Sequence, residues 1–449
     1  MTDQDLKLRV DDILVWGFAF WPFFWSVWGL IRVPYGIMGY SITSLVLIAL
    51  AGFAVFFHPK LPLLPLGIWM CFPAVIILEN FQDMTKQCSR DLTVMICGVL
   101  FCMAMQQQEY NKRMILRCLF WCGIIIALSV ILDSATHILR FNRLRFYKPD
   151  AARVKMNTRA SAGLVAYTGT AGGFIYTALG AWLALLKLHE GYVSRIVKWG
   201  VIGCFVMSAV LILKRGFIID FAAAAVFLLL IQIRKEDLEK LNITRLIQGI
   251  FGMLFIAAAF IAAYLALPAV RGPVDALIER FSGSDGSMAN LSGRTDLYAV
   301  AINLFKQNKL TGVGWGRFRS YTVGFYNMSN DVSFATHNVY LQLLCETGIL
   351  GFAAFIAAAG SALVWGVMRY RSLLRSDPEG TDRWAAAIGI FLQVFFLAYC
   401  MSGNPLYDYN FLITYFIGIV LTSGLCSKEK QEKTDKEKNT IENRYSYIL

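Results

Sequence analysis

Apolar runs long enough to cross a bilayer as α-helices, about 20 residues each, recur along the chain and constrain its fold more than any other feature. A helix satisfies its own backbone hydrogen bonds, which lipid cannot do. The chain is 57% hydrophobic and 16% charged, whereas soluble domains carry about 25% charged residues. The predicted fold class is therefore an all-α polytopic membrane protein.

The apolar runs place about twelve transmembrane helices and leave one long polar loop before the tenth. The spans are 13–30, 36–57, 62–79, 91–106, 114–132, 161–186, 196–213, 216–233, 246–267, 348–367, 384–402 and 409–425. The predicted domains are a bundle of about nine spans (1–267), an extracytoplasmic catalytic loop of short helices (268–347), three C-terminal spans (348–426) and a polar cytoplasmic tail (427–449). Residues 161–186 are rich in Gly, Ala and Thr, so we expect this span to pack among other helices.

The distribution of Lys and Arg predicts that both termini are cytoplasmic, because the short cytoplasmic loops then carry most of the basic residues. The loop 133–160 is an exception, since it lies outside yet holds Arg140, Arg143, Arg145, Lys148, Arg153, Lys155 and Arg159. A miscounted span, binding to anionic lipid headgroups, or binding to an anionic ligand would each explain this excess.

A second cationic position interrupts the apolar stretch 201–233. Lys214-Arg215-Gly216 predicts a very tight turn between two helices at the outer face. Charges near a bilayer are usually functional or paired, and Asp220 is close enough along a helix to pair with either cation. The alternative is simple snorkelling to the membrane interface.

The long loop contains a short amphipathic helix within 292–305, because Leu297, Ala301 and Leu304 share one face. Ser292 or Thr295 is expected to cap this helix. Arg294 would then lie beside a helix start, where backbone N–H groups and a guanidinium together favour an anion.

Two further motifs follow in the loop. Gly312-Val-Gly-Trp-Gly316 predicts close backbone approach, and its spacing is not that of a dinucleotide fingerprint. Thr336 is expected to cap a helix that carries His337 in its first turn. A lone histidine is more often structural than catalytic, but nearby arginines would keep this ring neutral and able to accept a proton near pH 7.

Taken in this order, the motifs resemble the bacterial O-antigen ligase and O-antigen polymerase superfamily, membrane glycosyltransferases that act on undecaprenyl-diphosphate-linked glycans. The resemblance covers roughly 157–402. Its residues are Lys214-Arg215-Gly216, Gly293-Arg294 leading to Gly312–Gly316, and His337-Asn338 followed by Leu341, Glu346, Gly348, Leu350 and Gly351. The family usually has Ser where Lys214 stands here.

The resemblance implies a GT-C-like fold in the bacterial inner membrane, with the active site on the extracytoplasmic face. It implies that Arg215, Arg294 and Lys214 hold the donor diphosphate and that His337 is the general base of an inverting, metal-independent transfer. Arg159, Asn338 and Trp315 would make further donor or acceptor contacts. Aromatic residues of the loop could stack on sugar faces, or they could simply pack within the loop. These aromatics are Trp315, Phe318, Tyr321, Phe325 and Tyr326.

No cofactor and no metal are expected, since the four histidines are scattered and the outer loop has no Asp-x-Asp. The expected partners are the undecaprenyl-diphosphate-linked donor, a glycan or lipid A-core acceptor, and membrane lipid, with no nucleic acid. A polytopic transporter or flippase of lipid-linked glycan is the alternative function, although the sequence shows no internal repeat. The shared motifs do not separate polymerase from ligase.

Overall fold

The computed structural model describes most of the chain as helix. The described residues are 3–31, 37–59, 66–106, 108–136, 161–165, 167–188, 195–212, 214–232, 275, 287–323, 334–377 and 380–423. Within these ranges no β-strand occurs.

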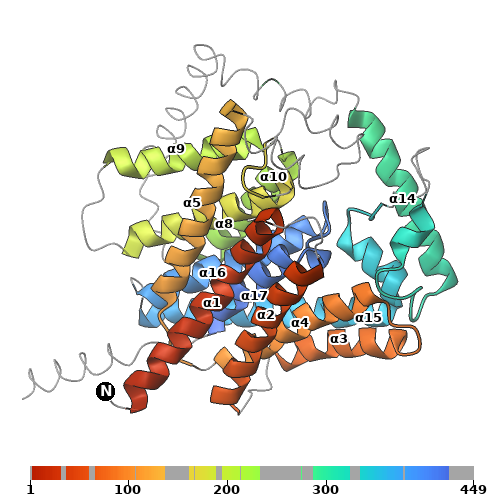
Figure 1. Cartoon of the computed structure of the whole chain (residues 1–449), viewed down its shortest axis with the longest axis horizontal. Helices are drawn as coiled ribbons and strands as arrows, with labels where there is room; N and C mark the ends of the chain where they lie inside the picture. The colour runs from red at the N-terminus through yellow and green to blue at the C-terminus, as the bar shows by residue number, and fades with distance from the viewer. Residues whose placement is uncertain are drawn as a thin grey trace, which may run out of the picture.

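The helices form one bundle, with α5, α8, α9 and α10 grouped on one side and α3, α4 and α15 on the other (Figure 1). Their bounds are α1 (Asp3–Ile31), α2 (Ile37–Phe57), α3 (Gly67–Asn80), α4 (Lys86–Met105), α5 (Lys112–Thr136), α8 (Thr168–Leu188), α9 (Arg195–Leu211), α10 (Arg215–Gln232), α14 (Ser287–Gln307), η1 (Phe318–Thr322), α15 (Val339–Ser376), α16 (Thr381–Tyr399), η3 (Pro405–Tyr407) and α17 (Tyr409–Ser423).

Every predicted span except 246–267 coincides largely with one of these helices, and 246–267 lies outside the described residues. Six of the described helices are long and apolar enough to cross a membrane: α4, α5, α8, α10, α15 and α16. The all-helical architecture of a polytopic membrane protein is thus supported. The count of twelve spans, the extent of the outer loop and the domain boundaries stay predictions.

The span predicted at 161–186 begins as a turn, because the helix α8 starts only at Thr168. The turn is anchored at its first residue, where Ser161 donates its N–H to the carbonyl of Leu211 (3.1 Å) and its hydroxyl to Asp133 (2.6 Å). Beyond the turn, α8 buries most of its small residues against α5 and α16. The expected packing of this segment among other helices is confirmed.

Polar contacts separate the bundle into two ends. At the far end, Lys112 forms an ion pair with Asp382 (3.1 Å), and the N–H of Asn111 donates to Asp12 (2.6 Å). At the other end, which we name the site end, Val339 donates its N–H to Cys400 (2.8 Å). The turn 81–85, the turn 161–165, Lys214 and the segment 400–408 all belong to the site end. Among the described residues, those predicted to be extracytoplasmic therefore lie at one end of the bundle, as an alternating set of spans requires.

Helix α15 kinks at Gly348, whose backbone (φ 57°, ψ −160°) is almost exclusive to glycine. The kink leaves backbone groups without helical partners, and the segment 309–314 takes them. Ile349 donates its N–H to Lys309 (2.9 Å), while Cys345 and Glu346 accept the N–H groups of Val313 and Gly314 (2.9 Å each). The kink therefore holds the segment after α14 against α15.

Gly348→Ala is expected to destabilise the protein by roughly 2–4 kcal/mol, because an added Cβ would lie 2.2 Å from the carbonyl oxygen of Leu310 and the backbone conformation would be strained. The measurement is the apparent Tm in detergent. Gly360→Ala is the matched control in the same helix, since a Cβ there meets nothing within 4 Å. Equal Tm values for the two variants would contradict the role given to the kink.

Candidate functional site

His337 lies immediately before α15 and not in its first turn. Asn338 is the N-cap residue, and its side chain accepts the N–H of Leu341 (3.1 Å). Thr336, the expected cap, instead accepts the N–H of Asn338 (3.1 Å) through its hydroxyl. The helix start is thus shifted by two residues from the prediction, which leaves the histidine side chain exposed outside the helix.

The backbone of His337 is strained. Its φ of 56° is the one positive value for a non-glycine residue in the described part of the chain, and such a conformation costs on the order of 1–3 kcal/mol. Hydrogen bonds that run from the preceding residue into α15 stabilise this backbone conformation. The backbone N–H of Thr336 donates to the Gln342 side chain (3.4 Å), and the Gln342 amide donates to Glu346 (3.1 Å). Strain held in this way is typical of functional positions.

Positive charges surround the imidazole. Desolvation, together with the charges of Arg294, Lys214 and Arg319, lowers the pKa of His337 from 6.5 to about 4. The ring is therefore neutral at pH 7, as the sequence analysis expected. The structure brings together three of the predicted site residues, Lys214, Arg294 and His337, and adds Arg319, which sequence reasoning missed.

The turn before α10 is fixed by packing below it. Lys214 accepts the N–H of Phe217 (3.2 Å), and the buried Phe217 ring contacts the ring of Tyr399 (centroids 4.6 Å apart). Arg215 is the first residue of α10 and is partly buried. Asp220 is 4% exposed, and no ion pair joins it to Lys214 or Arg215 in the described structure. The suggested pairing of this carboxylate is not seen.

Arg294 is not at a helix start, because α14 begins at Ser287, about two turns earlier. The expected caps at Ser292 and Thr295, and an anion pocket of helix N–H groups, are thus incorrect. The amphipathic face is confirmed: Leu297, Ala301 and Leu304 are buried together with Phe318 and Cys345. Helix α14 lies at the edge of the bundle beside α15 (Figure 1). Arg294 is exposed on this helix.

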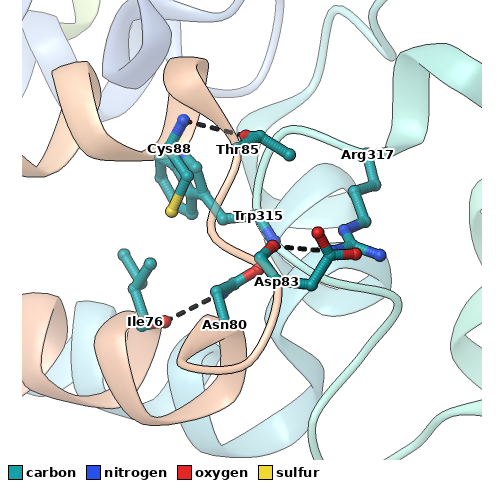
Figure 2. Close-up of polar contacts among 7 residues, drawn as sticks. All are labelled: Ile76, Asn80, Asp83, Thr85, Cys88, Trp315 and Arg317. Carbon is teal, nitrogen blue, oxygen red and sulfur yellow. Dashed lines mark hydrogen bonds and ion pairs between the residues drawn. The ribbon is translucent and has the colours of Figure 1, made fainter.

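The loop 312–317, here named the glycine loop, contains three glycines with φ of 67°, 101° and 75°. A Cβ at Gly312 would lie 2.3 Å from the backbone of Glu346, so the expected close backbone approach is confirmed. On the side away from Glu346, the glycine loop contacts the turn between α3 and α4. Figure 2 shows Arg317 paired with Asp83 (2.6 Å) and the N–H of Trp315 bonded to Asn80 (3.0 Å).

Glu346 is the centre of this arrangement. Its fully buried carboxylate accepts four hydrogen bonds, from the N–H groups of Gly316 (2.9 Å) and Phe318 (3.1 Å), the Gln342 amide (3.1 Å) and the Tyr407 hydroxyl (2.6 Å). One side chain therefore joins the glycine loop, η1, the helix that follows His337 and the turn η3.

Trp315 is fully buried and has no ring face open to a sugar. Its indole N–H donates to Asp91 (2.8 Å), and its ring stacks on Tyr407 (centroids 4.6 Å apart). Loop packing, the alternative reading, accounts for this residue and for the equally buried Phe318. Tyr321 is exposed. Arg159, Phe325 and Tyr326 lie outside the described residues, as does most of the loop 133–160.

Sequence reasoning missed the positioning carboxylates and Arg319. Asp91 had a usable signal, since a carboxylate at the edge of an apolar run is usually functional or paired. It accepts bonds from Trp315 (2.8 Å), Tyr409 (2.7 Å) and Gln87 (2.8 Å). Arg319 had no such signal, because residue type and spacing do not distinguish it from its neighbour Arg317, which pairs with Asp83.

Part of this chain is similar in sequence to a known protein family. Residues 200–356 match the family model described as O-antigen ligase. The resemblance to the O-antigen ligase and polymerase superfamily is confirmed. The matched region contains Lys214, Arg294, Arg319 and His337, the four groups that the structure brings together.

A second similarity lies with the exopolysaccharide production protein ExoQ of Rhizobium meliloti (strain 1021). It is 26% identical over 153 residues, which are 32% of this chain and 34% of that protein. The alignment therefore spans about a third of this curated relative.

Glu346→Gln is expected to lower the stability by about 2–3 kcal/mol, because an amide nitrogen would face N–H or O–H donors that now point at a carboxylate. The measurement is again the apparent Tm in detergent. Glu109→Gln, at the far end, is the control. An unchanged Tm for both variants would exclude the central role of this carboxylate.

Proposed function

We propose that this protein transfers a glycan from an undecaprenyl-diphosphate donor to an acceptor hydroxyl during the assembly of a cell-surface polysaccharide. The single observation that carries the proposal is a neutral, exposed histidine surrounded by Arg294, Lys214 and Arg319. Cations of this kind suit a phosphorylated substrate, and a neutral imidazole suits a proton acceptor beside it.

The chemistry follows from these two parts. The acceptor oxygen attacks the anomeric carbon, and His337 takes the hydroxyl proton on a ring nitrogen. The bond between the sugar and the phosphate breaks, and its electron pair leaves with the diphosphate. Arg294 and Lys214 stabilise the negative charge that develops there, as fixed cations do without any metal. Arg215 would contribute from the first turn of α10. One displacement inverts the anomeric centre.

Its low pKa makes His337 a weak base in the free protein. Binding of the diphosphate donor is expected to raise this pKa. A bound diphosphate neutralises the cations that now lower the pKa of the imidazole, so its pKa rises when the substrate is present. The base gains strength at the moment when it is needed. This coupling requires the histidine and the anion to occupy one site.

The comparisons support a role in polysaccharide assembly and leave the acceptor open. The matched family is described as O-antigen ligase, and the curated relative is named for exopolysaccharide production. A polymerase would use a lipid-linked repeat unit as acceptor, and a ligase would use lipid A core. The positive-inside pattern supports an inner-membrane protein whose site end faces away from the cytoplasm.

A transfer assay tests the proposal. Purified protein receives undecaprenyl-diphosphate glycan, EDTA, and either a repeat-unit or a lipid A-core acceptor. His337→Asn is expected to lower the rate at least about hundredfold, since general-base catalysis contributes that much. Asparagine is chosen because it tolerates the left-handed backbone of this position. Arg294→Ala should lower the rate at least about tenfold.

Lys306→Ala serves as the control, because it removes an exposed cation from the same helix as Arg294. A ladder of products identifies a polymerase, and a single addition to lipid A core identifies a ligase. If the folded parent transfers nothing to either acceptor, or if both site variants remain fully active, the proposal is wrong and lipid-linked glycan transport becomes the better reading.

The pH dependence gives a second test. The reaction needs the unprotonated imidazole, which is present above its pKa and lost as the pH falls through that value. Because kcat/KM reports the free enzyme, it should hold its value through pH 6.5 and fall only toward about 4. Arg294→Gln should move this acid limb upward. A limb at 6.5 in the parent would show that no cation acts on His337.

A further inference from the structure

Arg319 lies on the short helix η1, which is fastened at both of its ends. The N–H of Phe318 donates to Glu346 (3.1 Å). At the other end the buried hydroxyl of Thr322 donates to the carbonyl of Phe334 (2.8 Å) and accepts the N–H of the same residue (3.0 Å). Phe334 is three residues before His337. The position of the arginine backbone is therefore fixed relative to the histidine.

The same packing relates Arg319 to Arg294. The fully buried Phe318, which precedes Arg319, packs against Leu297 and Ala301 of α14. Arg294 is about one turn before Leu297 on that helix. The two arginines thus extend from neighbouring parts of one hydrophobic cluster, and both act electrostatically on the imidazole of His337.

The two arginines of this segment differ in their partners. Arg317 is paired with Asp83 and donates to its backbone carbonyl (2.8 Å). Arg319 is exposed, and within the described residues neither a hydrogen bond nor an ion pair engages its guanidinium. A guanidinium that is held near two other cations adds to the repulsion among the three charges. An anionic ligand would remove that cost.

We propose that Arg319 binds a phosphate group of the substrate, as a third cation beside Lys214 and Arg294. The inference rests on the proposed function and adds a residue that no motif assigns. A diphosphate carries several acceptor oxygens and more charge than one cation neutralises, and a guanidinium offers a paired set of donors to such oxygens. Arg319 would reach the phosphates from the η1 side, while Arg294 reaches them from α14.

The test uses farnesyl diphosphate, a short isoprenyl diphosphate, titrated into the full-length protein in detergent and followed by calorimetry. Arg319→Gln should weaken binding at least about tenfold, the loss expected when a charge-assisted hydrogen bond is removed. Arg317→Gln is the matched control, two residues away, and should leave affinity within about twofold because exposed ion pairs contribute little. With farnesyl monophosphate as the ligand, the difference in affinity between Arg319→Gln and the parent should be smaller.

The outcomes separate this inference from the proposed function. If Arg294→Gln weakens binding and Arg319→Gln does not, the third cation is wrong and the proposed function stands. If the folded parent does not bind farnesyl diphosphate, or neither variant weakens its binding, both are wrong. Equal losses for Arg317→Gln and Arg319→Gln would mean that the loop was disrupted, and would also overturn the inference.

The titration of His337 supplies a readout that a merely structural role would not move. The chain has four histidines, so NMR of protein labelled at histidine carbons gives few signals, and His337→Asn assigns the relevant one. Arg319→Gln should shift the pKa of His337 upward, toward 6.5, and farnesyl diphosphate should shift it upward in the parent. No shift in Arg319→Gln would contradict the placement of this cation beside the ring.

Discussion

The buried carboxylate of Glu346 is the interaction on which the rest of the site depends. Burial raises the pKa of this carboxyl to about 7, and hydrogen-bond donors offset part of the cost of burying its charge. Four donors do so here, and they come from the glycine loop, η1, α15 and η3. The need to solvate one carboxylate therefore organises backbone that lacks regular structure of its own.

The same network accounts for the geometry around His337. The kink at Gly348 releases backbone groups to the segment after α14, and the Gln342 side chain carries the support back to the residue before the histidine. The imidazole is thus held in a strained backbone, beside cations that approach from α10, α14 and η1. Such a preorganised positive site stabilises developing negative charge without having to rearrange.

Sequence reasoning located the helices well because apolar length and helical periodicity are local signals. It also identified the buried face of α14 and the closeness of the glycine loop, since both follow from residue type and spacing. It failed where the environment of a residue depends on partners far away in the sequence. The sequence left sugar stacking and loop packing as alternatives for Trp315. The choice depends on Asp91, more than two hundred residues earlier, which accepts its indole N–H. The start of α14 and the cap of α15 were misplaced because several capping residues stood close together.

The contact between the glycine loop and the turn after α3 has a consequence for modularity. Asn80 and Asp91 hold the loop through buried hydrogen bonds, yet both precede the region 200–356 that matches the O-antigen ligase family. The matched region is therefore not a transplantable unit. A chimera that exchanges it alone would separate the loop from its anchors, so a functional exchange has to carry 80–91 along with it. The boundary of sequence similarity and the boundary of structural cooperation do not coincide in this protein.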